Sequence, residues 1–326
     1  MTTSSRATKG WLLYLLLAVD KKALIVRLSS LGDVVLSSCV VEPLKDMGYH
    51  PHLLTFEPYG DIFEDDKRLS VIQVKKEELF QEDTLKKLKG FDLYVDLQKN
   101  LKTIVLRLFI RGSWKSYNKQ SIRRRLAVYV KALRKPYHVV DAYLEAIGQK
   151  GFRPNIEVSE ERLRAWKEKL GDNFVCIAPG ARYKKKRYPY FKQVVDLLKK
   201  EGIKVVLVGD GQDRLLTEGF DGVNLCGELS LVDTLAVIKL ARAFVGNDSG
   251  LLHMARAVGT KAVQIYGGTH PTLGFSLYPD EGIVLLKNLK CQPCDPHGKG
   301  HCKLKTYECL QIEPQTVASA LLTLIR

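Results

Sequence analysis

The sequence predicts an α/β protein of two domains, each built on a mostly parallel sheet, that face each other across a cleft. Short apolar, strand-like runs alternate with helical stretches along most of the chain. The alternation stops at 148–160, where GQKGFRPNIEVSE is rich in Gly, Pro and polar residues, and then restarts. We therefore assign 1–20 to an N-terminal extension, 21–150 to a first α/β domain and 151–326 to a second one, whose last helix we allow to pack back on the first domain.

The composition is typical of a folded protein, and the charge is typical of a protein that binds polyanions. The 326 residues are 45% hydrophobic and 27% charged, which excludes a disordered or fibrous chain. Lys and Arg number 51 against 36 Asp and Glu, a formal net charge of +15. This charge favours nucleic acid, anionic lipid or phosphorylated ligands as partners, and does not choose among them.

The extension contains one apolar run, WLLYLLLAV at 11–19. Its nine residues are too few for a spanning helix, which needs roughly 20. Two lysines follow, and no small-x-small cleavage site precedes them, which disfavours a signal peptide. A short helix on a membrane surface and a non-essential extension remain as the two interpretations.

The first domain opens with a predicted strand at 23–28, followed by the turn SSLGD and a helix that ends near Gly48. Further strands are predicted at 52–56 and 91–98. Asp33 lies where the first strand passes into its helix, the place where open α/β sheets bind ligands. It is either an acidic residue favoured by the helix dipole or a general base. The loop has one glycine, Gly32, so a GxGxxG dinucleotide motif is absent.

The second domain repeats the alternation in a regular order. A strand that runs into a Gly turn is predicted at 174–180, strands at 203–211 and 261–268, and a strand with a loop after it at 243–250. Helices are predicted at 191–202, 231–243, 251–259 and 316–325. The loop after its first strand, APGARYKKKRYP, carries four consecutive basic residues from Lys184 to Arg187. Exposed N–H groups beside cations suit phosphate, and a solvated basic loop is the alternative. The Walker spacing is missing.

The segment FVGNDSGLLHMARAVGT at 244–260 is the most informative. A strand leads directly into a helix there, so Ser249, Gly250 and Leu251 offer free N–H groups to an anion, and His253 follows in the first turn. Capping by a polar loop and a structural histidine are the alternatives. The combination favours a pyrophosphate site. In VGDGQD, Asp213 is either a ribose ligand or a turn residue.

Two other segments are compositionally distinct. Seven basic residues lie among apolar and aromatic ones at 119–138, as in a solvated helix face. Four of the seven cysteines lie near the C-terminus in a C-x2-C pattern followed by two single cysteines: Cys291, Cys294, Cys302 and Cys309. This pattern suggests a zinc or iron–sulfur ligand set, with His297 and His301 as alternative ligands. The other three cysteines lie in apolar segments, which is typical of a cytosolic protein with reduced thiols.

Five segments, taken together and in order, resemble glycosyltransferase family 9, the ADP-heptose:lipopolysaccharide heptosyltransferases. They are RLSSLGDVVLSS, PGARYKKKRYP, GNDSGLLHMARAVGT, YGGTHP and the terminal CxPC segment. The resemblance runs from about Lys22 to the C-terminus. It implies the GT-B fold of two Rossmann-like domains. It also implies inverting, metal-independent transfer of heptose from ADP-heptose to the lipopolysaccharide inner core, with the donor bound mainly by the second domain.

The resemblance assigns roles residue by residue. Asp33 matches the catalytic base, and Asp213 falls where an acidic residue binds the adenosine ribose. This sequence departs from the commoner family pattern at two positions: it has Asp at 213, where Glu is frequent, and Ser at 249, where Thr is frequent. The implied donor-phosphate ligands are Lys186, Ser249, Gly250, Leu251 and His253, and the implied sugar and nucleotide ligands are Asp248, Asp213 and Gly180. The basic residues Arg123, Arg124 and Arg125 are the implied acceptor ligands.

The same resemblance sets expectations for cofactors and partners. No cofactor is required beyond the ADP-sugar donor, and the four cysteines are packing thiols or a local disulfide more readily than a metal site. The acceptor is an anionic lipid A or inner-core molecule, and the enzyme works in the cytoplasm, peripherally on the inner membrane. Within this resemblance the basic segment 119–138 lies in the acceptor domain, where its charge would dock on the anionic membrane surface. The alternatives are a GT-B transferase for another nucleotide sugar and a basic nucleic-acid-binding protein, which leaves GNDSGLLH unexplained.

Overall fold

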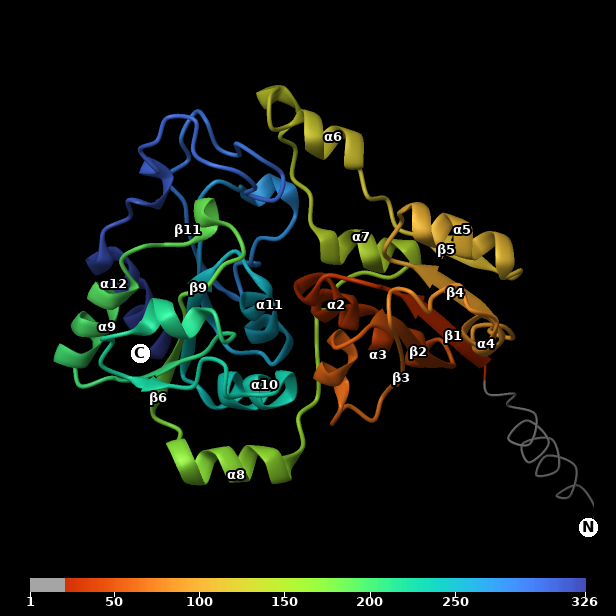
Figure 1. The fold of residues 1–326 in the computed structure, drawn as a ribbon, viewed down its shortest axis with the longest axis horizontal. Coiled ribbons are helices and arrows are strands. Elements are labelled where there is room, and N and C mark those ends of the chain that lie inside the picture. The colour runs from red at the N-terminus through yellow and green to blue at the C-terminus, as the bar shows by residue number, and fades with distance from the viewer. Residues whose placement is uncertain (1–20) are drawn as a thin grey trace, which may run out of the picture.

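The computed structural model describes residues 21–326, and it contains two parallel sheets that lie side by side (Figure 1). The first sheet has five strands in the order β3-β2-β1-β4-β5, all paired in parallel. Its strands are β1 (Lys21–Val26), β2 (Tyr49–Phe56), β3 (Ser70–Val74), β4 (Leu93–Asp96) and β5 (Trp114–Ser116). The helices between them are α2 (Leu31–Ser37), α3 (Val41–Asp46), α4 (Glu82–Lys87), α5 (Leu101–Phe109), α6 (Ser121–Leu126) and α7 (Val139–Ala146).

The second sheet has six strands in the order β11-β10-β9-β6-β7-β8, also all parallel. Its strands are β6 (Phe174–Ala178), β7 (Lys204–Leu207), β8 (Val223–Asn224), β9 (Ala243–Asn247), β10 (Ala262–Ile265) and β11 (Gly282–Leu285). Its helices are α8 (Glu160–Leu170), α9 (Phe191–Lys200), α10 (Leu231–Leu240), α11 (Gly250–Ala257) and α12 (Pro314–Ile325). The predicted α/β class with two parallel sheets is confirmed.

Each sheet is covered on both faces, because alternate residues of a strand point to opposite sides. In β1, Ala23 and Ile25 belong to one core, and Leu24 and Val26 to another. The strand β6 divides in the same way, with Phe174 and Cys176 on one side and Val175 and Ile177 on the other. These fully apolar strands are typical of a parallel sheet buried between helices.

Two expectations about helices need correction. The helix α12 packs against α9 and against strands of the second sheet, so the last helix does not return to the first domain as we had allowed. The basic segment 119–138 is not one continuous helix face. It forms the short α6 and a 3-10 turn, η3 (Lys131–Leu133), with a turn and extended chain around them.

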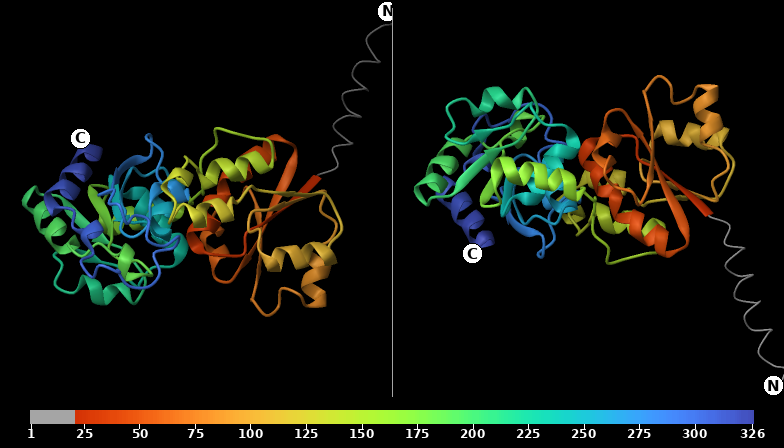
Figure 2. Two further views of the ribbon diagram at one scale, coloured as in Figure 1. Left: turned by 90° about the horizontal axis from the view of Figure 1, so that it is seen from above. Right: turned by 90° about the horizontal axis from the view of Figure 1, so that it is seen from below.

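The two domains meet where α2 and α11 approach each other at their N-terminal ends. A Cβ atom placed on Gly32 would lie 2.7 Å from Cδ2 of His253 and 3.3 Å from Cα of Gly250. Only glycine therefore allows the two helices this close an approach. Figure 2 shows the two lobes joined in this central region. Both helices follow the carboxyl ends of their strands, so the edge that binds ligands in open α/β sheets faces inward from each domain.

Two features of the sequence bear on membranes. The apolar run WLLYLLLAV lies outside the described residues. Among residues 21–326, no helix combines the length and the apolar character needed to cross a membrane.

Candidate functional site

A cavity of about 410 Å³ lies between the two domains, at the point where α2 and α11 converge. Residues from both domains and from the C-terminal cysteine-containing segment line it. They are Ser30, Gly32, Asp33, Arg182, Tyr183, Lys186, Asp248, Ser249, Gly250, His253, Phe275, Pro296, His297 and Lys299. Convergence of carboxylates, cations and a helix N-terminus in one hollow makes this cavity the candidate site.

Asp33 enters the cavity from the first turn of α2. One carboxylate oxygen, Oδ1, lies 2.8 Å from Nη2 of Arg27, and the other, Oδ2, accepts a hydrogen bond of 3.1 Å from the Ser30 hydroxyl. Burial alone would lower the pKa of the Arg27 guanidinium, but Asp33 and nearby tyrosines raise it above its ordinary value. Arg27 therefore stays charged, and it holds Asp33 in one orientation while part of the carboxylate remains open to the cavity.

Lys186 enters from the opposite domain, in the 3-10 turn η4 (Lys184–Lys186). Its Nζ lies 2.9 Å from Oδ2 of Asp248, which also accepts a hydrogen bond of 2.8 Å from the Thr269 hydroxyl. Burial would raise the pKa of Asp248, but Lys186 lowers it below its ordinary value. Asp248 is therefore ionised, and it fixes the Lys186 ammonium at the wall of the cavity.

The N-terminus of α11 completes this side of the site. Ser249 is the N-cap residue, yet its side chain makes no capping hydrogen bond, and its buried Oγ has no partner within the described chain. The same holds for Nδ1 of His253. Buried polar atoms without partners are uncommon in folded proteins. With the free N–H groups of the helix end, these two atoms indicate an anionic or polar ligand here.

His253 is neutral at physiological pH. Burial, followed by the positive charge of Arg256, lowers the pKa of His253 to about 3. A neutral imidazole at this position offers one N–H donor or one acceptor to a ligand without adding a charge.

This lowered pKa gives a pH-dependent stability. The unfolded chain, with a histidine pKa of about 6.5, takes up the proton first, so the free energy of unfolding should fall as pH drops below about 6.5. The slope attributable to His253 is at most about 1.4 kcal/mol per pH unit. Urea unfolding between pH 5 and 7 should show a shallower slope for His253→Gln than for the wild type. The exposed His301→Gln variant serves as the control, and equal slopes in all three proteins would contradict the assignment.

Asn247 connects the elements around the site. Its Nδ2 donates to the carbonyl oxygens of Pro179 and Gly180, and its Oδ1 accepts from the backbone N–H of Tyr188. The buried end of β9 is thereby joined to both ends of the loop that carries Lys186. Asn247 belongs to the segment 244–260 but has no role that the sequence alone indicates, because its partners lie about 60 to 70 residues away in the chain.

Three of the expected donor ligands lie outside the cavity lining: Gly180, Asp213 and Leu251. Gly180 and Asp213 pack against each other, because a Cβ atom on Gly180 would lie 2.1 Å from either carboxylate oxygen of Asp213. Burial raises the pKa of Asp213. Gly180 follows strand β6 and Asp213 follows strand β7, at the same edge of the sheet but outside the lining of the cavity. The proposed ribose role of Asp213 stays a prediction.

The three arginines expected to bind the acceptor differ in their surroundings. The Arg124 guanidinium lies 5.1 Å from the ring centre of Tyr137 and 5.2 Å from that of Phe275, which lines the cavity. Arg123 also lies over the Tyr137 ring, and Arg125 is exposed. Arg124 is thus the one of the three that lies beside a residue of the cavity wall.

The cysteine-containing segment contributes to the candidate cavity in a way that the sequence alone did not indicate. Pro296, His297 and Lys299 line the cavity, and a Cβ atom on Gly298 would lie only 2.6 Å from Cγ of Lys186. The carboxylate of Asp295 shapes this turn by accepting from the backbone N–H groups of His297 and Lys299. Arg182, Tyr183 and Phe275 were also not assigned. The run of basic residues at 182–187 could have pointed to Arg182 as a phosphate ligand. No sequence pattern indicated that residues 296–299 lie beside Lys186 in the cavity wall.

The four C-terminal cysteines are free thiols in this structure. Cys291 is exposed and Cys309 is buried, and the backbone N–H of Cys294 donates to the carbonyl oxygen of Gly268. Across the described residues, no three His, Cys, Asp or Glu side chains are grouped so that they could hold a metal ion. The segment is attached to the loop after β10 through backbone contacts.

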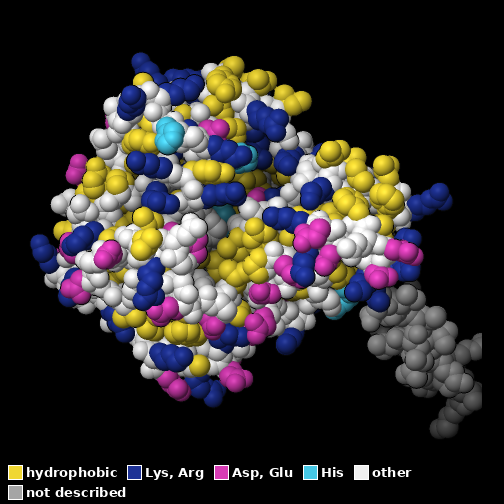
Figure 3. Space-filling model, in the orientation of Figure 1, with side chains coloured by type: hydrophobic (Ala, Val, Ile, Leu, Met, Phe, Trp, Pro, Cys, Tyr) yellow, Lys and Arg dark blue, Asp and Glu magenta, His cyan; other side chains and the backbone are white. Residues whose placement is uncertain are grey.

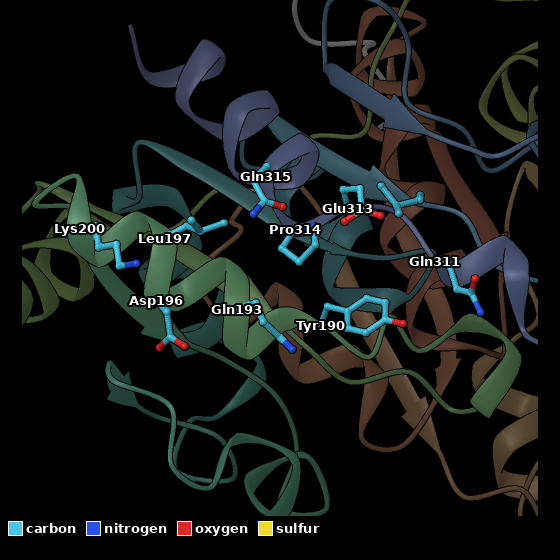
Figure 4. Close-up of a pocket in the computed structure, with 10 residues that line it drawn as sticks. Tyr190, Gln193, Asp196, Leu197, Lys200, Gln311, Glu313, Pro314 and Gln315 are labelled. Atoms are coloured by element: carbon cyan, nitrogen blue, oxygen red, sulfur yellow. The ribbon is translucent and has the colours of Figure 1, made fainter.

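A larger hollow, of about 600 Å³, lies between α9 and the start of α12. Tyr190, Gln193, Lys200 and Gln311 are among its lining residues, and Figure 4 shows the side chains spread along the two elements instead of converging. Asp196, also in the lining, is paired with Lys192, and no buried unpartnered polar atom of the described chain belongs to the hollow. Its chemistry indicates a surface groove, not a reactive site.

Comparison with known proteins gives one consistent family. The family model described as glycosyltransferase family 9 (heptosyltransferase) matches residues 83–305. Lipooligosaccharide heptosyltransferase 2 of Haemophilus influenzae is 29% identical over 186 residues, which cover 52% of this chain and 51% of that protein. The chain thus matches about half the length of this curated relative.

Two solved structures share the fold. The Escherichia coli ADP-heptose lipopolysaccharide heptosyltransferase II is similar with a TM-score of 0.70 and 18% identity, covering 93% of this chain and 98% of that one. The E. coli heptosyltransferase WaaC, solved with ADP, is similar with a TM-score of 0.60 and 20% identity, covering 81% and 92%. The similarity extends across both domains, in agreement with the predicted GT-B fold.

Proposed function

Because the chain belongs to glycosyltransferase family 9, we propose that it transfers heptose from ADP-heptose to the inner core of lipopolysaccharide. The observation that carries the proposal is the pairing of two sets of groups across one cavity. A carboxylate from the first domain faces a lysine and a helix N-terminus from the second. Sugar transfer from a nucleoside diphosphate is favoured by a base for the acceptor hydroxyl and by positive groups for the leaving diphosphate.

The donor diphosphate binds in this proposal at the second-domain wall. The Lys186 ammonium, the N–H groups at the start of α11 and the free Oγ of Ser249 are suited to phosphate oxygens. Arg182 and Lys299 add positive charge around the same cavity. The solved complex of WaaC with ADP supports an adenine nucleotide as the donor.

The reaction that fits the site is a single displacement with inversion. Asp33 takes the proton from the attacking hydroxyl of the acceptor, and that oxygen bonds to the anomeric carbon as the bond to ADP breaks. Positive charge builds on the sugar and negative charge on the departing diphosphate, as in glycoside hydrolysis. Lys186 and the α11 N–H groups stabilise the leaving group electrostatically, so we propose that no divalent metal is needed.

The acceptor approaches from the first-domain side. Arg124 lies beside Phe275 at the cavity wall, where a cation suits the phosphates or carboxylates of an inner-core saccharide. We propose that the enzyme meets this lipid-linked acceptor in the cytoplasm, at the surface of the inner membrane.

Nucleotide selectivity tests the donor assignment. ADP should raise the melting temperature, with a gain in stability of about 2.7 kcal/mol at a hundredfold excess over the dissociation constant, while UDP, GDP and a random DNA duplex should not. Stabilisation by UDP or GDP instead would favour a transferase for another nucleotide sugar, and stabilisation by the duplex alone would favour the nucleic-acid alternative. A turnover assay with ADP-heptose and defined core acceptors then identifies the step.

A further inference from the structure

The first domain exposes an unusual group of large apolar side chains. Among the described residues, eleven such side chains are exposed, and eight of them lie on or beside the two short helices α5 and α6. They are Leu101, Ile104, Leu108, Phe109, Ile122, Leu126, Tyr129 and Val130, and we call this surface the α5–α6 face. The exposed fractions reach 78% for Leu108 and 79% for Tyr129. Exposed apolar side chains that gather on one part of a protein surface are typical of an interaction site.

The helix α5 has one face for the core and another for this surface. Thr103 and Leu106 are buried, and Leu106 packs in the core of the first sheet. Leu101, Ile104 and Leu108 follow the helical spacing of three and four residues on the exposed side. Packing within the domain therefore does not explain why Leu101, Ile104 and Leu108 are apolar.

The charge of this region has one sign. Between Asp96 and Asp141 the sequence has 12 Lys and Arg residues and no Asp or Glu. The formal net charge of the whole chain is +15. None of these 12 cations forms a salt bridge with a described carboxylate. Figure 3 shows hydrophobic side chains with Lys and Arg side chains among them over the part of the molecule where Figure 1 places α5 and α6.

The same surface borders the cavity. Ile122 and Leu126 of α6 are exposed, while Arg124 of the same helix lies against Phe275 of the cavity wall. A molecule held at the α5–α6 face can therefore present a group at the mouth of the site.

We propose that the α5–α6 face docks on an anionic lipid bilayer. The apolar side chains insert at the level of the headgroups, and the surrounding lysines and arginines contact lipid phosphates. A bilayer matches the surface because it offers apolar depth and negative charge together over a wide area. The inference rests on the proposed function in one respect: a lipid-linked acceptor is what places the cavity mouth beside a membrane.

Vesicle binding of the full-length protein tests the proposal. The probes are vesicles of phosphatidylcholine alone and of an equimolar mixture of phosphatidylcholine and phosphatidylglycerol. The apolar variant is Leu101→Gln, Leu108→Gln and Ile122→Gln combined. The charge variant is Lys102→Glu, Arg111→Glu and Lys131→Glu combined. The matched control is Leu215→Gln with Leu304→Gln, two exposed leucines outside the face.

The wild type and the control should sediment with the anionic vesicles and not with phosphatidylcholine alone. Each face variant should lose on the order of tenfold or more in partition coefficient, with an unchanged melting temperature, because the replaced side chains are exposed. Vesicle binding by the face variants equal to that of the wild type would overturn the proposal. It would also fail if light scattering showed that the face variants dissociate a wild-type dimer that does not bind vesicles.

Turnover separates this inference from the proposed function. On an acyl-free inner-core saccharide, the face variants should transfer heptose at the wild-type rate, and on the same acceptor embedded in anionic vesicles they should be slower. If the wild type transferred heptose to neither acceptor while vesicle binding still depended on the face, the proposed function would be wrong and the docking surface would stand.

Discussion

The Asp33→Asn variant is expected to transfer heptose about a hundredfold or more slowly than the wild type while it still binds ADP. Asparagine keeps the size of the side chain and a contact with Ser30, but it does not accept a proton at neutral pH. Since Asp33 lies on the first-domain wall and the donor ligands on the second, the loss should fall on kcat and leave the dissociation constant for ADP unchanged.

The measurement needs a control for charge and for folding. Asp83→Asn replaces an acidic residue in the first turn of another helix, α4, where the side chain is exposed, and it should keep full activity. Because the Asp33→Asn change leaves the buried Arg27 without its ion-pair partner, some loss of stability is expected too. Urea unfolding of the variant therefore accompanies the kinetics. A wild-type rate for Asp33→Asn would place the general base elsewhere.

The Lys186→Met variant is expected to lose roughly 3 to 4 kcal/mol of transition-state stabilisation, a factor of several hundred in rate. Two effects combine in this loss. The positive charge that faces the leaving diphosphate disappears, and the buried carboxylate of Asp248 loses its ion pair. The remaining negative charge would repel the diphosphate, so the affinity for ADP should fall as well, unlike in the Asp33 variant.

Lys184→Met is the matched control, because Lys184 lies in the same 3-10 turn but is exposed and outside the cavity. Its kcat and its affinity for ADP should stay close to the wild type. Steady-state kinetics with ADP-heptose and calorimetry with ADP measure the two quantities separately. If both lysine variants lost activity equally, the effect would belong to the overall basic charge of the loop and not to the Lys186–Asp248 pair.

The two variants together test whether the site is divided between the domains. Loss of turnover alone for Asp33 and loss of both turnover and ADP affinity for Lys186 is the pattern expected from their positions. A loss of ADP affinity in the Asp33 variant would mean that the first domain also grips the nucleotide.

The sequence indicates those residues of the candidate cavity that lie at strand-to-helix junctions. Asp33, Lys186 and Asp248 to Gly250 all follow a predicted strand, and all line the cavity. His253 lies in the first turn of α11 and also lines the cavity. The rule that parallel strands present ligand sites at their carboxyl ends was sufficient for these residues, because it depends on local pattern alone.

The remaining features depended on contacts between distant segments. The sequence by itself determined the α/β class, the two sheets, the family and the residues at the strand ends, because apolar periodicity and short motifs are local properties of the chain. Only the tertiary structure decided that Gly32 meets His253, that 296–299 returns to Lys186, and that the apolar side chains of α5 and α6 stay uncovered. These contacts join segments tens to hundreds of residues apart, and the choice among such pairings is made by packing, which no local pattern encodes.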